Sequence, residues 1–326
     1  MHMHLLITGG CGFIGSNIAQ HFLENNLFEH ITIVDNLSTG FLSNIEPLLK
    51  KYSNLKYIHG DITDLEICRK VTKNIDVICH QAATGSVPRS INDPYFYNNN
   101  NVNGFFNIIV AAKENGVKRF VYASSSSVYG DEPVLPKVED KVGNLLSPYA
   151  ATKKINEIYA NVFTKCYGME CIGLRYFNIF GPKQNPNGEY AAVIPKFIQM
   201  IQNGESPTIN GNGEYSRDFT YIDNVIQANY LALTTENPEC FGETFNIGAE
   251  GRVTINQLYF AICAILGKNV EPIYGPIRNG DIPHSNANIN KAKELLGYNP
   301  KDDFAKGIEK TVKYFIGDND VKKEIL

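Results

Sequence analysis

Six short apolar runs in the first half of the chain are separated by segments with helical periodicity, and this alternation constrains the fold most strongly. The runs are residues 4–8, 31–35, 55–58, 76–80, 119–123 and 171–176. Most of them are apolar throughout, as expected for strands whose two faces are both covered by helices. Helices are predicted between them, for example at residues 14–25 and 107–115. Repeated units of this kind predict an α/β fold with a doubly wound parallel sheet.

The pattern changes after residue 176, where turn-forming residues become frequent. In the second half, helices are predicted at residues 194–202, 223–234, 255–266, 291–296 and 304–315. We expect a first domain of residues 1–176, to which segments near 217–250 return. Residues 177–216 and 251–326 are expected to form a smaller mixed α/β domain that covers a substrate. A chain of 326 residues is long enough for two such domains.

The charge balance and the distribution of apolar residues argue against several classes of partner. Thirty basic and 34 acidic residues give a net charge of −4, so we expect no nucleic-acid partner. No apolar run reaches the length of a membrane span and no signal segment opens the chain, so we expect a cytoplasmic protein without membrane contact. The seven cysteines include no C-x-x-C pair, which favours reduced thiols and no metal site.

Three glycines follow the first predicted strand and open the first helix, with the spacing Gly9-x-x-Gly12-x-x-Gly15. Gly9 permits a tight turn, Gly12 lets the backbone approach a pyrophosphate, and Gly15 allows close packing of helix on strand. The helix N-terminus adds free N–H groups for an anion. Asp35 ends the second strand, where a carboxylate can bind a ribose 2′-hydroxyl and would repel a 2′-phosphate. The combination predicts a Rossmann-type domain that binds NAD rather than NADP.

Further candidates for cofactor contacts lie where other strands end, since ligands of such sheets bind at the carboxyl ends of the strands. Asp61 and Ile62 follow the third strand and could flank an adenine. Gln81, Ala82 and Ala83 follow the fourth, and the small alanines would let the backbone approach a pyrophosphate or a ribose. The glycine motif and the loop after the second strand add Phe13, Ile14, Asn36, Ser38, Thr39 and Gly40 to these candidates.

Tyr149 and Lys153 are four residues apart, so on a helix they lie on one face and can meet the same ligand. Pro148, with Ser147 as a cap, suits the start of that helix. A phenol with a pKa of about 10 is a poor base at neutral pH. We expect the Lys153 cation and an oxidised nicotinamide to lower the pKa of Tyr149 toward the working range. Serines 124–127 follow the fifth strand, where a hydroxyl can bridge a substrate hydroxyl to the phenolate.

Over nearly its whole length the chain resembles the extended short-chain dehydrogenase/reductases, and within them the nucleotide-sugar 4-epimerases of the NAD-dependent epimerase/dehydratase family. The stretches that carry this resemblance are residues 8–15, 124–130, 149–153, 174–178, 216–219 and 278–281. Residues 81–90, 146–150 and 185–195 resemble more narrowly the branch that acts on UDP-N-acetylglucosamine and UDP-N-acetylgalactosamine. That branch serves surface-polysaccharide synthesis in bacteria and archaea.

The resemblance implies roles for four catalytic residues. Tyr149 would take the proton from the sugar 4-hydroxyl as the C4 hydride passes to tightly held NAD. The 4-keto sugar would then turn over in the site and receive the hydride on its other face. Lys153 would bind the nicotinamide ribose and lower the pKa of Tyr149. Ser125 matches the catalytic hydroxyl of the family, which also contacts substrate, and Ser127 stands where a supporting Ser or Thr is usual.

The resemblance also implies binding residues and an assembly. Asn101 and Phe177 would contact the cofactor. The UDP-sugar would be held by Asn178, Val193, Arg217, Arg278 and Asp281, and its sugar pocket would be lined by Gly85, Ser86, Gln184, Ala192 and Ser285. The small Ser285 would leave room for a 2-acetamido group, and Gln184 could bind that group's amide. A homodimer is expected, formed through the helices at residues 103–115 and 149–164.

Three alternatives are weighed against a 4-epimerase. A nucleotide-sugar 4,6-dehydratase would carry an Asp-Glu pair, and a UDP-glucuronate decarboxylase a Glu, where this chain has Ser126 and Ser127. A non-catalytic NAD-binding sensor is disfavoured by the intact set of Ser125, Tyr149 and Lys153. A net oxidoreductase stays open, because the sequence does not show whether reduced NAD leaves the protein.

Overall fold

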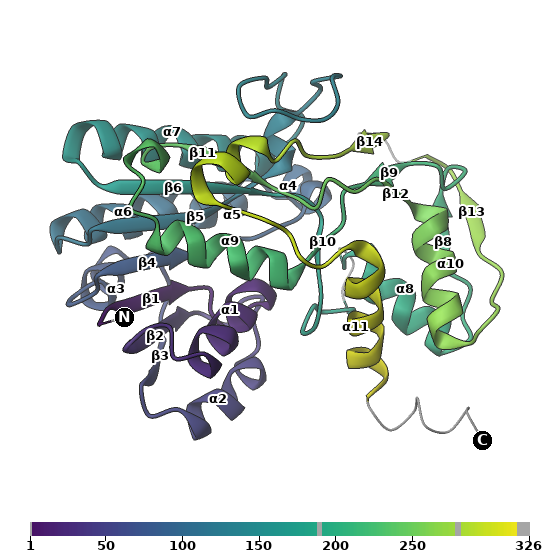
Figure 1. Cartoon of the computed structure of the whole chain (residues 1–326), viewed down its shortest axis with the longest axis horizontal. Coiled ribbons are helices and arrows are strands. Elements are labelled where there is room, and N and C mark those ends of the chain that lie inside the picture. The colour runs from purple at the N-terminus through teal and green to yellow at the C-terminus, as the bar shows by residue number, and fades with distance from the viewer. Residues whose placement is uncertain (1, 188–190, 278–281, 318–326) are drawn as a thin grey trace.

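The computed structural model of the protein describes residues 2–187, 191–277 and 282–317. Its main feature is a parallel sheet of seven strands in the order β11-β6-β5-β4-β1-β2-β3 (Figure 1). The strands are β1 (His4–Thr8), β2 (His30–Asp35), β3 (Leu55–His59), β4 (Val77–His80), β5 (Arg119–Ser125), β6 (Glu170–Tyr176) and β11 (Thr244–Ile247). The predicted α/β fold with a doubly wound parallel sheet is confirmed. The strand order reverses beside β1, and ligands of such sheets bind at this switch point.

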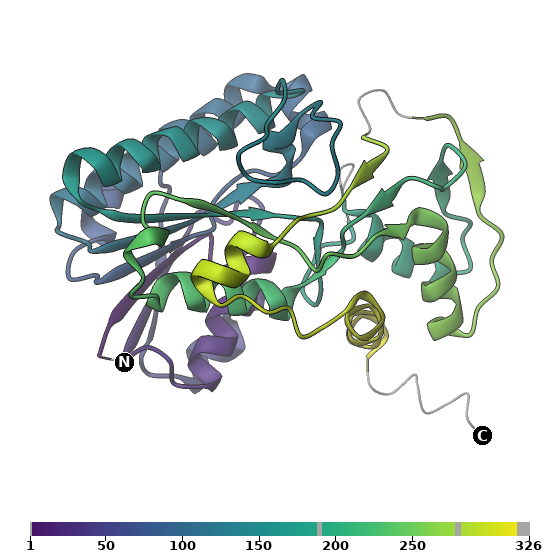
Figure 2. The same ribbon diagram turned by 45° about the horizontal axis from the view of Figure 1, so that its top comes forward.

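Helices cover both faces of the sheet (Figures 1 and 2). One face carries α1 (Phe13–Glu24) and α9 (Ile222–Thr234); the other carries α3 (Leu65–Val71), α6 (Gly104–Glu114) and α7 (Pro148–Tyr167). Successive side chains of a strand point to opposite faces, so Leu5 and Ile7 join the first core and Leu6 joins the second. All three are fully buried, each contributing about 1.5–3 kcal/mol of burial free energy.

Local sequence signals set the position of α7, the helix that carries Tyr149. The Ser147 hydroxyl caps its start by accepting from the Ala150 N–H at 3.1 Å, and Pro148 occupies the first turn. The helix ends at Gly168, whose φ of +68° is the left-handed conformation that glycine adopts readily. These caps place Tyr149 and Lys153 in the first two turns, next to the carboxyl end of β5.

A smaller lobe lies beyond the carboxyl end of the sheet (Figure 2). It consists of α8 (Val193–Gln202), α10 (Ile255–Leu266), α11 (Phe304–Ile316) and two small sheets, β8 (Thr208–Asn210) with β13 (Ile273–Gly275), and β9 (Ser216–Arg217) with β12 (Val253–Thr254) and β14 (His284–Ser285). Strands β7 (Ile179–Phe180) and β10 (Thr220–Tyr221) pair where the chain passes between the lobes. The remaining helices are α2 (Glu46–Lys51), α4 (Val87–Asn92), α5 (Pro94–Asn98), η1 (Leu42–Asn44), η2 (Asn99–Asn103), η3 (Ser126–Tyr129), η4 (Pro238–Cys240) and η5 (Ala292–Leu296). Within the described ranges, no helix combines the length and apolar character needed to cross a membrane.

The six strands predicted from the apolar runs all form, and their observed ends differ from the predicted ones by at most two residues. The seventh strand, β11, and the small sheets of the second lobe were not predicted. Within residues 217–250, α9 and β11 pack in the large sheet layer, whereas β9 with Arg217 belongs to a small sheet of the second lobe. Helix η5, from a segment expected in the substrate-covering domain, packs against α9 and β11.

Candidate functional site

A groove of about 410 Å³ lies at the switch point of the large sheet. We call it the dinucleotide groove. Most of the sequence-predicted cofactor residues line it, namely Gly9, Gly12, Phe13, Ile14, Gly15, Asp35, Asn36, Ser38, Thr39, Asp61, Ile62, Gln81, Ala82 and Ala83. Six more residues line it without having been predicted for the cofactor: Val34, Gly60, Thr84, Gly85, Asn100 and Gln184. Gly85 and Gln184 were predicted for the sugar pocket, and the structure places them on this groove.

The glycine positions leave no room for a side chain. Gly9 has φ of +69°, and a Cβ there would lie 2.7 Å from the Ala82 backbone. A Cβ on Gly15 would collide with the Gly9 carbonyl oxygen. Gly40 packs in the same way against Cys11 and Gly12, so it supports the loop from outside the groove. Larger residues would therefore displace the backbone that forms the cradle.

Asp35 holds the glycine loop and faces the groove. One carboxylate oxygen accepts from the Cys11 N–H at 2.9 Å, and the other accepts from the Leu37 N–H at 2.8 Å. Each oxygen retains a lone pair for a further donor such as a ribose hydroxyl. Beside it, the Asn36 amide donates to the Asp61 carboxylate at 2.8 Å and joins the loops after β2 and β3. The buried negative charge of Asp35 fits NAD better than NADP.

Two observations show that the groove fits a dinucleotide. Gly9, Gly12 and Gly15 line the groove, and without side chains they leave their backbone open to the approach of a pyrophosphate. In addition, the Gln184 side-chain oxygen is buried at the groove and has no hydrogen-bond partner within the described part of the chain. A buried acceptor without a donor is costly, so it marks a place where a bound group completes the hydrogen bonding.

The predicted cofactor residues Asn101 and Phe177 lie behind the groove rather than on its lining. Asn101 is buried and exchanges hydrogen bonds with the Thr84 backbone, accepting from its N–H at 2.8 Å and donating to its carbonyl at 3.0 Å. It also donates to the Thr152 hydroxyl on α7 at 3.2 Å. Phe177 is fully buried, with its ring 6.0 Å from that of Tyr129. Both residues hold the wall in place.

The structure brings the four predicted catalytic residues together at the junction of β5, η3 and α7. A side-chain hydrogen bond joins Tyr149 to Ser125. The Ser127 hydroxyl donates to that of Ser125 at 3.0 Å. The Lys153 ammonium lies 6.0 Å from the centre of the Tyr149 ring and donates to the Ala123 carbonyl at 2.9 Å. The group therefore forms a hydroxyl chain with a buried cation beside it.

Burial dominates the titration of this group. It raises the pKa of Tyr149 above its ordinary value, and the hydrogen bond with Ser125 opposes this only in part. Burial lowers the pKa of Lys153 to about 8. The decrease expected from Lys153 together with an oxidised nicotinamide is not produced by the protein groups alone, because desolvation outweighs the hydrogen bond with Ser125. The other charge from which a decrease is expected is that of an oxidised nicotinamide.

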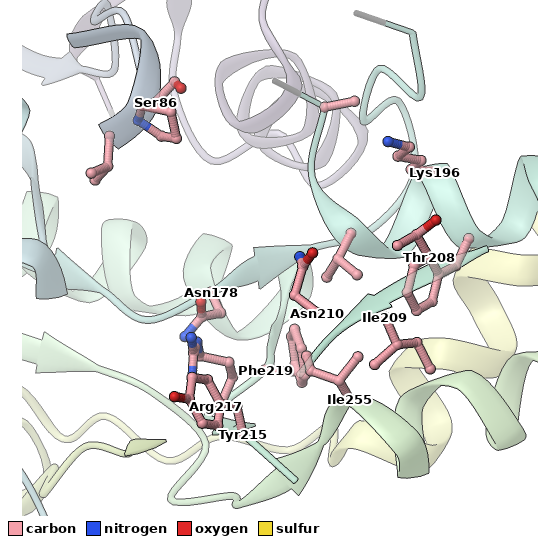
Figure 3. Close-up of a pocket in the computed structure, with 15 residues that line it drawn as sticks. Ser86, Asn178, Lys196, Thr208, Ile209, Asn210, Tyr215, Arg217, Phe219 and Ile255 are labelled. Carbon is pink, nitrogen blue, oxygen red and sulfur yellow. The ribbon is translucent and has the colours of Figure 1, made fainter. Parts of the chain in front are cut away.

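A second cavity of about 350 Å³, the lobe cavity, lies between α4 and the smaller lobe. The predicted substrate residues Ser86, Asn178, Val193 and Arg217 line it, and Figure 3 shows Ser86 across the cavity from Arg217 and Tyr215. Residues that sequence reasoning missed include Lys196, Phe197, Thr208, Ile209, Asn210, Tyr215, Phe219 and Ile255. Lys196 and Tyr215 directly adjoin stretches that carried the resemblance, and Phe219 belongs to one, so a sequence signal for these three residues was available. The others carry no local pattern of this kind.

The remaining predicted substrate residues lie near these cavities or outside the described part of the chain. Ser285 is the register partner of Arg217 in the small sheet, so the two residues are neighbours. Ala192 is the exposed residue before α8, between two residues that line the lobe cavity. Arg278 and Asp281 lie outside the described residues. The two cavities meet at consecutive residues, since Gly85 lines one and Ser86 the other.

Comparisons with known proteins identify the family of the chain. The family model described as NAD dependent epimerase/dehydratase family matches residues 5–248. A UDP-glucose 4-epimerase of Mycolicibacterium smegmatis is 34% identical, with 96% of this chain and 98% of that protein covered. The solved UDP-N-acetylglucosamine 4-epimerase of Methanobrevibacter ruminantium, in complex with UDP-N-acetylmuramic acid, is 39% identical with a TM-score of 0.90, covering 97% of this chain and 98% of that one. A dTDP-glucose 4,6-dehydratase of Streptomyces venezuelae with NAD bound is 28% identical with a TM-score of 0.90, covering 99% of both chains. The chain therefore belongs to the NAD-dependent epimerase/dehydratase family, and NAD is its cofactor.

Proposed function

We propose that this protein interconverts UDP-N-acetylglucosamine and UDP-N-acetylgalactosamine by epimerisation at C4 of the sugar. The observation that carries the proposal is the arrangement of Tyr149, Ser125 and Lys153 beside a dinucleotide groove that adjoins a second cavity containing an arginine. A guanidinium such as that of Arg217 presents donors in the geometry that a diphosphate accepts. The names of the related 4-epimerases support the same reaction class.

The residues of the chain would act on a single proton and on the orientation of the sugar. NAD, when bound, supplies reversible hydride transfer. Tyr149 takes the proton of the 4-hydroxyl through its phenolic oxygen and returns it when the hydroxyl re-forms. Ser125, held by Ser127, orients the reacting hydroxyl by a hydrogen bond. Lys153 keeps a positive charge in a buried site, which favours the phenolate.

The N-acetylated sugar is proposed because the residue beside Arg217 is small. Ser285 occupies that place, so a 2-acetamido group has room next to the diphosphate site. We expect Ser285→Tyr to reduce kcat/KM for UDP-N-acetylglucosamine by at least about tenfold more than for UDP-glucose, since the phenol would fill this space. Steady-state rates with both sugars measure the ratio. Ser285→Ala serves as the control, and equal losses on both sugars for the tyrosine variant would refute the pocket assignment.

A proton NMR time course tests the proposed reaction. The purified protein is incubated with UDP-N-acetylglucosamine without added NAD, and with UDP-glucose in a parallel sample. Formation of UDP-N-acetylgalactosamine faster than UDP-galactose is the expected result. Conversion of UDP-glucose alone would support a 4-epimerase and reject UDP-N-acetylglucosamine as its substrate. The uronic acid forms of these sugars can be tested in the same way. No conversion with either sugar, even with added NAD, would reject the proposal.

A 4,6-dehydratase is the main alternative, because a dehydratase is among the structural relatives. It needs an acid and a base beyond the tyrosine, and here the positions concerned are Ser126 and Ser127 on η3. Serine hydroxyls are poor general acids and bases at neutral pH. The NMR experiment separates the two reactions, because a persistent 4-keto-6-deoxy sugar would favour the dehydratase. A carbon dioxide assay tests for a decarboxylase in the same way, because released carbon dioxide would favour that enzyme.

We also propose a homodimer formed through α6 and α7, acting in the cytoplasm to supply surface-polysaccharide synthesis. Apolar side chains on these helices support the dimer. Phe106, Ile158, Val162 and Tyr167 are each between 39% and 55% exposed, which is unusual for a set on two adjacent helices. Sedimentation equilibrium at micromolar concentration is expected to give twice the chain mass of 36.4 kDa, and a mass of one chain would reject the dimer.

A further inference from the structure

The segment Gly181–Gln184 crosses from the smaller lobe onto the helix of the glycine motif. The Asn17 amide on α1 donates to the Pro182 carbonyl at 3.0 Å. A Cβ on Gly181 would lie 3.6 Å from the ring of Phe13, one of the residues that line the dinucleotide groove, so this part of the segment lies beside that ring. We call residues 181–184 the strap. Its position makes one edge of the cofactor site dependent on a segment distant in sequence.

Lys183 fixes the strap to two other segments. Its φ of +67° is left-handed, a conformation that a lysine rarely adopts. Its ammonium donates to the Gln20 side-chain oxygen at 2.8 Å, to the Asn44 carbonyl at 3.3 Å and to the Ser16 carbonyl at 3.5 Å. Three acceptors match the three N–H donors of an ammonium group. The left-handed backbone and the three hydrogen bonds of this half-buried ammonium together indicate that the position of Lys183 has a role beyond connecting the two lobes.

The Asn44 contact extends this anchor to the far side of the glycine loop. The Asn44 side chain donates to the Cys11 carbonyl at 2.9 Å, and the Phe41 N–H donates to the same oxygen at 3.0 Å. Cys11 lies between Gly9 and Gly12, so these bonds support the cradle directly. One ammonium thus connects the glycine helix, the segment after β2 and the strap, which are the three pieces of chain around this part of the groove.

The strap also brings an unsatisfied group to the groove. The amide nitrogen of Gln184 donates to the Ile179 carbonyl at 3.3 Å, which fixes the orientation of the side chain. Its oxygen, as described above, is buried without a donor. Gln184 is also a lining residue of the groove, so the residue next to Lys183 brings an unpaired acceptor to the edge of the cofactor site. Ribose hydroxyls and the carboxamide of a nicotinamide dinucleotide are donors of the required kind.

We propose that Lys183 is a positioning residue for NAD, which locks the strap over the dinucleotide groove and sets how long the cofactor stays bound. It acts through Gln184 on one side and through Asn44 and the glycine loop on the other. Opening the groove on this edge requires breaking its three hydrogen bonds. Retention of NAD through a catalytic cycle would then depend on a residue that contacts no substrate.

Release of NAD from Lys183→Met tests this role. The side chain keeps its length and loses the ammonium, and hydrogen bonds of a charged donor are strong enough that we expect dissociation at least about tenfold faster. Protein loaded with radiolabelled NAD is chased with excess unlabelled NAD, and bound label is followed by rapid filtration. Lys56→Met, an exposed lysine on β3, is the matched control and should release NAD at the wild-type rate.

A second variant keeps the test decisive if Lys183→Met folds poorly. Gln184→Ala removes the acceptor and leaves the lysine anchor, so we expect faster release with an unchanged melting temperature of the NAD-free protein. Normal release from a folded Lys183→Met, or from Gln184→Ala where the methionine variant does not fold, would overturn the proposal. The measurement uses NAD alone, so it is independent of which sugar the protein converts.

Discussion

Tyr149→Phe is expected to lower the rate of C4 epimerisation by about 10²–10⁴-fold, the range that proton transfer by a positioned side chain contributes. The phenylalanine keeps the ring and removes the oxygen that would carry the proton. The ring is half-buried with Lys153 beside it, so the variant is expected to fold and to bind NAD as the wild type does. Single-turnover NMR or coupled assays give the rate, and the absorbance of the purified protein gives the NAD content.

Tyr159→Phe provides a matched control for this result. This substitution also removes a phenolic oxygen from α7. The ring of Tyr159 packs on Phe106, whereas Tyr149 is hydrogen-bonded to Ser125. We expect its rate to stay within about twofold of the wild type. A rate for Tyr149→Phe within about twofold of the wild type would show that Tyr149 is not the base. A loss of bound NAD from that variant would show that the phenol acts mainly in cofactor binding.

Glu157→Gln is expected to lower the free energy of unfolding by about 3–5 kcal/mol, the usual cost of breaking one partner out of a buried ion pair. Glu157 on α7 accepts from Arg175 at 2.8 and 2.9 Å and from the Ser124 hydroxyl at 2.7 Å, and both charged side chains are at most 5% exposed. The substitution leaves the Arg175 charge buried with less compensation. Urea titration followed by circular dichroism measures the change.

Two controls separate burial from charge. Glu309→Gln breaks an exposed pair with Lys313 on α11, and should cost at most about 0.5 kcal/mol. Replacing Glu157 and Arg175 together by methionine should cost less than the sum of the single changes, because no buried charge is left unpaired. A small effect of Glu157→Gln would show that the pair is accessible to water.

The same pair makes stability depend on pH. Burial acts to raise the pKa of Glu157, but the hydrogen bonds and charge of Arg175 outweigh it, so the pKa lies below its ordinary value. The ionised form is therefore favoured by folding. Its stabilisation is complete above the unfolded-state pKa of about 4.3 and is lost as the pH falls through the lower folded-state pKa.

Features that lie close together in sequence were predictable, and features assembled from distant segments were not. The spacing of the glycines, Asp35 and the Tyr149–Lys153 pair is local, because strand ends and helical turns repeat at fixed intervals. Thr208 and Asn210 reach the lobe cavity through the pairing of the short strands β8 and β13, and such short strands have no periodicity that a sequence would show. Gln184 shows the limit of resemblance alone, since it was predicted for the sugar pocket and lies on the dinucleotide groove.

The titration of Tyr149 shows a different limit. A nearby cation lowers the pKa of a phenol, and that rule can be applied to any Tyr and Lys that share a helix face. Desolvation depends on everything that covers the two side chains, including α4 and α5, and it acts in the opposite direction. Only the packed structure shows whether burial or the favourable interactions have the larger effect on the pKa. With the protein groups alone, burial has the larger effect, and the pKa of Tyr149 is raised.

The position of β11 at the edge of the large sheet has a consequence for how the molecule can be divided. The chain completes six strands, builds much of the smaller lobe, and then returns to add the seventh strand beside β6. A fragment that stops after residue 176 would leave the β6 edge without its neighbour, and open sheet edges pair with other chains. Much of the smaller lobe is therefore inserted between β6 and β11, so exchange of this lobe between relatives has to preserve the pairing of β11 with β6.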